Sequence, residues 1–173
     1  MFALVLTGPP GAGKTSVLEA LSDALTADDV RHATVEVEAL TSAHPPLHDD
    51  QWAMPVAAIC GLYRRFGYHL LLVTATVESA EDLRVVVAAV GADAHAVVRL
   101  EAEPETLRQR IIEREPETFS ELDQLVAASA RLSRVIASLQ AITLALSTEG
   151  RRPAEVAADI RDALPVELRR AHG

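Results

Sequence analysis

The sequence of 173 residues has little cysteine, few aromatic residues and almost no lysine. Cys60 is the only cysteine, so no disulfide can form within the chain, and its apolar surroundings favour a core position. Aromatic residues make up only 3%, which means that the core has to be built from Ala, Val, Leu and Ile. Lys14 is the only lysine, and every other basic residue except histidine is an arginine.

Long hydrophobic runs and an excess of positive charge are also absent. No apolar run approaches the ~20 residues that cross a membrane, and no basic leader or cleavage site precedes the first apolar segment. We therefore expect a cytoplasmic protein with no membrane partner. The net charge of −9 and the pI of about 5.1 argue against a general nucleic-acid binder, because phosphate contacts need clustered Lys and Arg. A small anionic ligand in a locally basic pocket remains compatible with this charge.

The composition is that of one folded domain, with 49% hydrophobic and 24% charged residues. We expect that domain to span residues 1–165, with a short lid near 114–120, and residues 166–173 to form a polar tail. Apolar runs alternate with segments of helical periodicity, which is typical of βα units and a parallel sheet. The strands are expected at residues 2–7, 33–40, 69–76, 95–101 and 141–146. The helices are expected at residues 17–25, 51–66, 80–90, 105–115, 121–139 and 154–164.

Several helix ends carry recognisable signals. Asp49 or Asp50 is placed to cap the helix at 51–66. Ser79 and Gly91 bracket another helix, since a serine suits the first cap and a glycine the last. Pro104 opens the next helix, where its missing N–H costs nothing.

The segment from Gly8 to Thr15 fits the phosphate-binding pattern G-x-x-x-x-G-K-[ST]. It lies between a strand and a helix, as that motif requires, which disfavours its reading as an ordinary Gly/Pro-rich turn. Glycines let backbone N–H groups turn inward around phosphate oxygens, and the helix N-terminus adds partial positive charge. Lys14 is expected to reach the β- and γ-phosphates, and the Thr15 hydroxyl to ligate Mg²⁺. The predicted nucleotide-binding residues of this loop are Gly8, Pro9, Pro10, Gly11, Ala12, Gly13, Lys14, Thr15 and Ser16.

With the arginine-rich segment 104–114 and the loop 147–153 before a final helix, the chain resembles small P-loop kinases of the nucleoside-monophosphate-kinase-like group. Shikimate kinase, gluconate kinase, adenylylsulfate kinase and chloramphenicol phosphotransferase belong to that group. The resemblance implies a three-layer α/β P-loop fold, in which a five-stranded parallel sheet carries helices on both faces. It also implies an arginine-bearing lid after the fourth strand and a loop after the fifth strand that lies against the nucleotide base.

The residues at the ends of the second and third predicted strands depart from the group's pattern. The third strand ends in Thr74-Ala75-Thr76 without the aspartate that orders Mg²⁺ in many P-loop proteins; either threonine is a candidate to bind a water on Mg²⁺. Shikimate kinase carries Asp-x-Asp after its second strand, and this chain has Glu36-x-Glu38 there. Glu38 is the predicted residue that prepares the acceptor hydroxyl or holds Mg²⁺ through water, and its alternative is a solvated glutamate at a strand end.

Arginines are the remaining candidates for the site. Arg110 and Arg114 share a helix face and are predicted to clamp the transferring phosphoryl group, with Arg108 nearby. Arg110 alternatively stacks on the adenine ring, as the resemblance implies. Arg151, or its neighbour Arg152, is predicted beside the base. For each arginine the competing reading is an ordinary exposed side chain.

A cluster of His44, His48, Asp49, Asp50 and Trp52 lies where the resembled kinases shape the acceptor site. Its spacing does not support a metal site, and Trp52 is either an acceptor-stacking residue or part of the packing. The favoured function is a kinase that transfers the γ-phosphate of ATP to a small polar metabolite or antibiotic. The alternative is a regulatory ATPase acting on a protein partner. With either function, the protein is expected to be a monomer or a homodimer.

Overall fold

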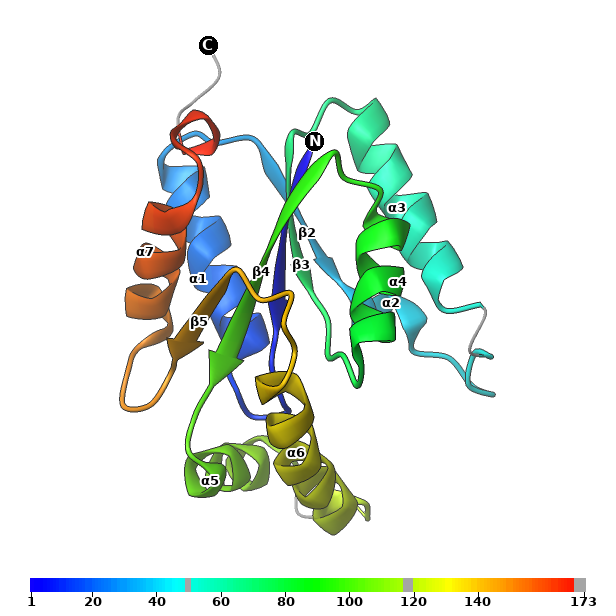
Figure 1. Ribbon diagram of the computed structural model, residues 1–173, viewed down its shortest axis with the longest axis vertical. Helices are drawn as coiled ribbons and strands as arrows, with labels where there is room; N and C mark the ends of the chain where they lie inside the picture. Colours follow the sequence, from blue (N-terminus) through cyan, green and yellow to red (C-terminus); the bar gives the residue numbers. More distant parts are fainter. Residues whose placement is uncertain (49–50, 117–119, 170–173) are drawn as a thin grey trace.

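A computed structural model describes residues 1–48, 51–116 and 120–169 of the chain. Five parallel strands form one sheet in the order β2-β3-β1-β4-β5, so that the first strand lies at the centre (Figure 1). The strands are β1 (Phe2–Thr7), β2 (His32–Glu36), β3 (Leu70–Thr74), β4 (Ala94–Glu101) and β5 (Leu144–Ser147). The helices are α1 (Lys14–Ala27), α2 (Val37–Thr41), α3 (Ala53–Arg65), α4 (Ala80–Val90), α5 (Pro104–Arg114), α6 (Leu122–Ala137) and α7 (Pro153–Ala163), followed by the 3-10 turn η1 (Val166–Leu168).

Alternation along the central strands divides the core into two layers. Leu4 and Leu6 of β1 pack on the side covered by α1 and α7, whereas Ala3 and Val5 pack on the side of α3 and α4 (Figure 1). Because both faces are covered by helices, the inner strands β1 and β3 are apolar along nearly their whole length, whereas the edge strand β2 alternates buried and more exposed residues. This arrangement confirms the expected three-layer α/β fold with a five-stranded parallel sheet.

The helix-end signals of the sequence are largely confirmed. Ser79 Oγ accepts a hydrogen bond from the N–H of Asp82 at 3.1 Å, and Gly91 adopts the left-handed conformation that ends α4. Pro104 is the first residue of α5. The predicted caps Asp49 and Asp50 of α3 lie outside the described residues, and Trp52 occupies the N-cap position there.

The second strand is shorter than predicted. It ends at Glu36, and residues 37–41 turn into the short helix α2 instead of continuing to residue 40. Glu, Ala and Leu favour helix, and the edge position of β2 leaves it paired with β3 alone. Val37 is nevertheless buried, because the helix turns it into the core while Glu38 leaves the strand. The predicted placement of Glu38 on the second strand is therefore wrong.

The remaining boundaries shift by a few residues. The third strand is confined to Leu70–Thr74, and the fifth begins at Leu144 rather than 141. The predicted lid near 114–120 lies partly outside the described residues.

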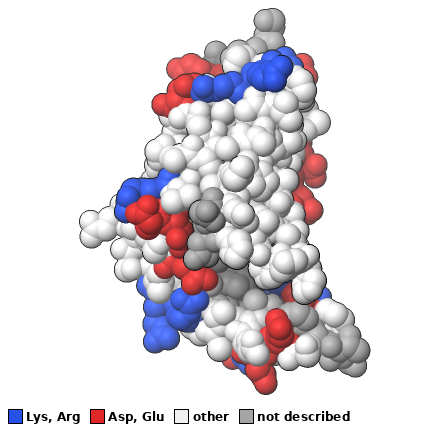
Figure 2. Space-filling view, turned by 90° about the vertical axis from the view of Figure 1, so that its right-hand side faces the viewer, with Lys and Arg blue, Asp and Glu red and all other residues white. Residues whose placement is uncertain are grey.

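Figure 2 shows that charged side chains lie mainly at the rim of the face covered by α3 and α4. The outer residues on and just after α3 include exposed Met54, Leu62 and Phe66.

Candidate functional site

The phosphate-loop segment follows the central strand, at the carboxyl edge where open parallel sheets bind ligands. Strand β1 has β3 on one side and β4 on the other, so a crevice opens where the chain leaves it. Gly11 has a φ of +83°, and a Cβ there would lie 2.6 Å from the carbonyl oxygen of Leu107. A glycine is thus required at this position by both conformation and space. The loop is pressed against α5, which fixes its shape.

Helix α1 begins directly at the end of this loop. Its N-cap is Gly13, which has a φ of +87° and provides no side-chain cap. The first N–H groups of a helix have no partner within the helix, so those of α1 are left for a ligand. Together with the helix dipole they form an anion-binding end. A cavity of about 530 Å³ adjoins them, lined by residues of the loop and by Arg110, Glu113 and Arg114.

Lys14 is folded back onto its own loop. Its Nζ donates to the carbonyl oxygen of Gly8 at 2.9 Å and to that of Pro9 at 3.5 Å. Burial lowers the pKa of Lys14 to about 8; the nearby Glu38 carboxylate opposes this shift, and the Arg114 guanidinium adds to it. The hydrogen-bond partners of this ammonium are neutral carbonyl oxygens, and a bound phosphate would give it a negatively charged partner. The half-buried position of the chain's only lysine therefore suits an anionic ligand.

The Thr15 hydroxyl faces a carboxylate of the neighbouring strand β2. Its Oγ1 donates to Glu36 Oε2 at 2.8 Å, and Glu36 is the last residue of β2, in register with Thr74. The sequence favoured Glu38 over Glu36 for this region, and the structure instead brings Glu36 to Thr15. Two hard oxygen atoms meet at the loop, and such ligands suit Mg²⁺, which keeps water and phosphate oxygens for its other positions. Thr15 and Glu36 are accordingly the residues that fit this ion.

Glu38 lies in the first turn of α2, two residues beyond the end of β2. Its Oε1 accepts the backbone N–H of Thr76 at 2.5 Å, and it lies close enough to Lys14 to influence that pKa. It lines a separate cavity of about 230 Å³, whose walls also include Trp52 and Asp82. Glu38 therefore lies between the phosphate loop and a small cavity, although not on the element that the sequence predicted.

Arg110 and Arg114 both line the cavity beside the phosphate loop, as the sequence predicted for neighbours of the phosphates. Arg110 is anchored: it donates to Thr148 Oγ1 and to the Thr148 carbonyl oxygen, each at 2.9 Å, and to the Gly11 carbonyl oxygen at 3.3 Å. Arg114 is more exposed and pairs with Glu115. Arg110 thus positions the loop that follows β5 against the phosphate loop, and Arg114 keeps the freedom to turn toward a ligand.

Two supports of the site were not predicted from the sequence. Buried Ser129 on α6 donates its hydroxyl proton to the Pro10 carbonyl oxygen at 2.7 Å, although 119 residues separate them. Thr148 is buried as well and receives Arg110, as described above. Ser129 lies in a segment without a motif, and the loop 147–153 that contains Thr148 was singled out for its arginines. No local pattern distinguishes either hydroxyl from other serines and threonines.

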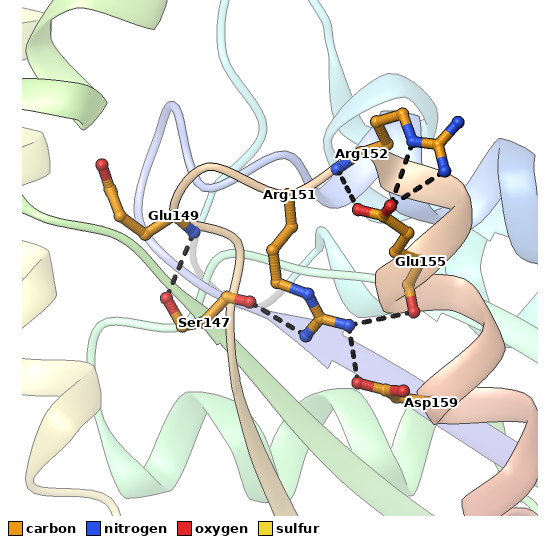
Figure 3. A network of polar contacts seen from close by, with 6 residues as sticks. All are labelled: Ser147, Glu149, Arg151, Arg152, Glu155 and Asp159. Carbon is orange, nitrogen blue, oxygen red and sulfur yellow. Dashed lines mark hydrogen bonds and ion pairs between the residues drawn. The ribbon is translucent and has the colours of Figure 1, made fainter.

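Arg151 is held by the last helix rather than by the phosphate-loop cavity (Figure 3). It pairs with Asp159 at 2.7 Å and donates to the carbonyl oxygens of Glu155 and Ser147 at 3.1 and 3.4 Å. Arg152, its neighbour in Figure 3, pairs with the Glu155 side chain at the start of α7. This network fixes the turn between β5 and α7, and contact of Arg151 with a nucleotide base stays a prediction.

The residues that the structure describes bear on three other kinds of site: a metal centre, a membrane span and a reactive cysteine. Within residues 1–48, 51–116 and 120–169, no three His, Cys, Asp or Glu side chains gather closely enough to hold a metal ion by themselves. Among the same residues, no helix has both the length and the apolar character needed to cross a membrane. Cys60 is buried, and burial raises the pKa of its thiol to about 11, as expected for a core residue and not for a nucleophile.

A family model described as "AAA domain" matches residues 4–141 of the chain. The sequence matches no curated protein. Among solved structures, a sugar kinase from Janibacter sp. HTCC2649 is similar over 99% of both chains, with a TM-score of 0.68 and 17% identity. The tunicamycin resistance protein of Deinococcus radiodurans is similar over 94% of both chains, with a TM-score of 0.63 and 17% identity. The APS kinase of Mycobacterium tuberculosis, in complex with AMPPNP and APS, is similar over 92% of this chain and 95% of its own, with a TM-score of 0.60 and 18% identity. These structures share the fold of the chain.

Proposed function

Because the chain belongs to the AAA domain family, we propose that it binds ATP with Mg²⁺ and transfers the γ-phosphoryl group to a hydroxyl of a small molecule. The observation that carries this proposal is the position of Glu38. Its carboxylate influences Lys14 in the phosphate-loop site, and it also lines a second cavity of about 230 Å³. A carboxylate between the donor site and an acceptor cavity suits a kinase, where it can orient or deprotonate the attacking hydroxyl, whereas a nucleotide-operated regulator has no need of an acceptor cavity.

The residues of the phosphate loop would hold the donor. The first N–H groups of α1 and the ammonium of Lys14 would face the phosphate oxygens, and Arg114 would turn from Glu115 toward the transferring group. Thr15 and Glu36 would hold Mg²⁺, which would supply positive charge to neutralise the phosphates. Arg110 stays anchored to Thr148 and keeps the loop in shape. Positioning and charge neutralisation supply most of the catalysis in phosphoryl transfer.

The acceptor hydroxyl would attack from the side of Glu38. A bond forms between the hydroxyl oxygen and the γ-phosphorus while the bond from that phosphorus to the β,γ-bridging oxygen breaks. The electron pair of the broken bond leaves with ADP, and the hydroxyl proton passes to the Glu38 carboxylate. The backbone N–H of Thr76 holds one oxygen of that carboxylate in place.

A pair of conservative substitutions tests the division of roles between the two glutamates. Glu38→Gln keeps an oxygen for the Thr76 N–H and should leave ATP binding intact while it lowers turnover by about 10²–10⁴-fold. Glu36→Gln should weaken the dependence of ATP binding on Mg²⁺. Glu105→Gln, on the exposed surface of α5, is the matched control and should change neither property. Undiminished turnover in Glu38→Gln would exclude this residue as the base.

A further inference from the structure

The charged side chains that line the cavity beside Glu38 are acidic in the part of the chain that the structure describes. Glu38 and Asp82 are the charged side chains that line it, and within the described residues no lysine or arginine does so. Helix α4 contributes Asp82 and Val86 to the cavity, and its Arg84 pairs with Glu81. Arg131 of α6 pairs with Glu78 at 2.8 Å. The charged residues lining this cavity are therefore negative, whereas those lining the phosphate-loop cavity are mainly positive.

Both carboxylates are fixed in place by the backbone. Glu38 Oε1 accepts the N–H of Thr76 at 2.5 Å, and Asp82 Oδ2 accepts the N–H of Glu78 at 2.9 Å. Within the described part of the chain, the second oxygen of each carboxylate has no hydrogen bond. Each therefore presents a hydrogen-bond acceptor whose position is set before a ligand arrives, and such groups bind hydroxyls and ammonium groups.

Positive charge is concentrated on the other side of Glu38. Lys14, Arg110 and Arg114 line the phosphate-loop cavity, where a triphosphate would neutralise them. These cations would then not be free to neutralise an acceptor. An acceptor with its own carboxylate, phosphate or sulfate would place that negative charge beside Glu38 and Asp82. Like charges brought together in a binding site are costly, and this cost discriminates against the wrong ligand.

The size and remaining walls of the cavity narrow the ligand further. Its volume of about 230 Å³ lies below the ~300–1,000 Å³ of pockets for drug-sized ligands. Trp52 provides an aromatic wall, and Val37 and Val86 provide aliphatic ones. A small ring with one apolar face and hydroxyl groups at its edge matches this combination.

We infer that the acceptor is a small hydroxyl-rich molecule without negative charge, either neutral or amine-bearing, and that Glu38 and Asp82 exclude anionic acceptors. That the ligand of this cavity is a phosphoryl acceptor rests on the proposed function. The preference of the cavity for ligands without negative charge is a property of the protein alone and does not depend on catalysis. The two are therefore testable by separate measurements.

The first measurement uses Trp52, the only tryptophan of the chain, as a reporter inside the cavity. Its fluorescence is quenched by caesium and by iodide at equal ionic strength, and the ratio of the two quenching constants is compared with that of free N-acetyltryptophanamide. The combined variant Glu38→Gln with Asp82→Asn keeps both backbone hydrogen bonds and should lower the caesium-to-iodide ratio by at least about twofold. Glu105→Gln with Glu167→Gln removes two exposed carboxylates elsewhere and should leave the ratio near that of the unaltered protein. A ratio that is the same in all three proteins would overturn the inference, whether or not the protein is a kinase.

The second measurement compares acceptors of matched skeleton in an assay of acceptor-dependent ADP release. The probes are glucose, glucosamine, gluconate and glucose 6-phosphate, extended to neutral, amine-bearing and anionic members of other ring families. The value of kcat/KM for the best neutral or amine-bearing acceptor should exceed that of its anionic partner by at least about tenfold. Faster turnover of an anionic partner would overturn the inference and leave the kinase proposal standing. A lack of acceptor-dependent ADP release with every probe would count against the proposed function, and the quenching ratios would then decide the charge selectivity alone.

Discussion

Raising the pH from 7.5 to 9 should weaken ATP binding about eightfold, because Lys14 loses its proton over this interval. Burial lowers the pKa of Lys14 to about 8 in the unliganded protein. With that value the ammonium is about three-quarters populated at pH 7.5 and about one-tenth populated at pH 9. If nucleotide binds only when Lys14 carries its proton, the apparent affinity falls in the same proportion.

The sign of the effect follows from the two states of Lys14. In the free protein its pKa lies below the ordinary value of 10.5, since its ammonium is buried with little compensating charge. Bound phosphate raises the pKa again, so binding takes up a proton, about half a proton per site at pH 8. The same burial destabilises the unliganded fold at neutral pH, and this cost is relieved as the pH rises from about 8 toward 10.5.

Isothermal titration calorimetry with Mg²⁺ and ATP measures both quantities. The dissociation constant is followed between pH 7.5 and 9 at constant ionic strength, and the proton uptake is obtained from buffers of different ionisation enthalpy. Lys14→Met is the control: it should bind more weakly at every pH, without the eightfold change, and should unfold at a higher temperature than the unaltered protein when unliganded. A dissociation constant that is the same at pH 7.5 and 9 would refute the assignment of Lys14 as a phosphate ligand with a lowered pKa.

Two substitutions test the packing around the phosphate loop, and one labelling experiment tests the core beneath α3. Gly11→Ala should cost about 2 kcal/mol or more of unfolding free energy and abolish ATP binding, because its new Cβ meets the Leu107 carbonyl oxygen and its φ is positive; urea unfolding and calorimetry measure both. Ser129→Ala should cost about 1–2 kcal/mol by leaving the Pro10 carbonyl oxygen without its buried donor, and an unchanged urea midpoint would contradict this. Cys60 should not react with a thiol reagent at pH 8 in the native protein and should react fully in denaturant, since it is buried and its pKa is raised to about 11.

The sequence was sufficient to predict the fold and the phosphate loop, because their signals are local. The run of apolar strands predicted a parallel sheet, and the glycines, Lys14 and Thr15 stand in a fixed pattern between a strand and a helix. Caps such as Ser79 and Gly91 act within one helical turn, so their neighbours in the sequence are also their neighbours in space. For features of this kind, periodicity and turn chemistry carry most of the information.

The rest of the site depends on contacts between distant segments. The alternation of Val35, Glu36, Val37 and Glu38 fits a strand as well as it fits a strand followed by a helical turn, and tertiary packing of Val37 decides between them. This choice moved Glu38 from the strand to α2 and brought Glu36 to Thr15. Ser129 reaches its partner across 119 residues, which no local pattern encodes.

We propose above all that this protein transfers the γ-phosphoryl group of ATP to a small molecule. Mass spectrometry of reactions containing ATP, Mg²⁺ and a mixture of neutral, amine-bearing and anionic hydroxyl compounds tests it directly, with Lys14→Met and Glu38→Gln as controls. The proposed function predicts an acceptor whose mass has grown by one phosphoryl group, formed in step with ADP and lost in both variants. ADP and free phosphate released in equal amounts, with every candidate acceptor unmodified, would contradict it.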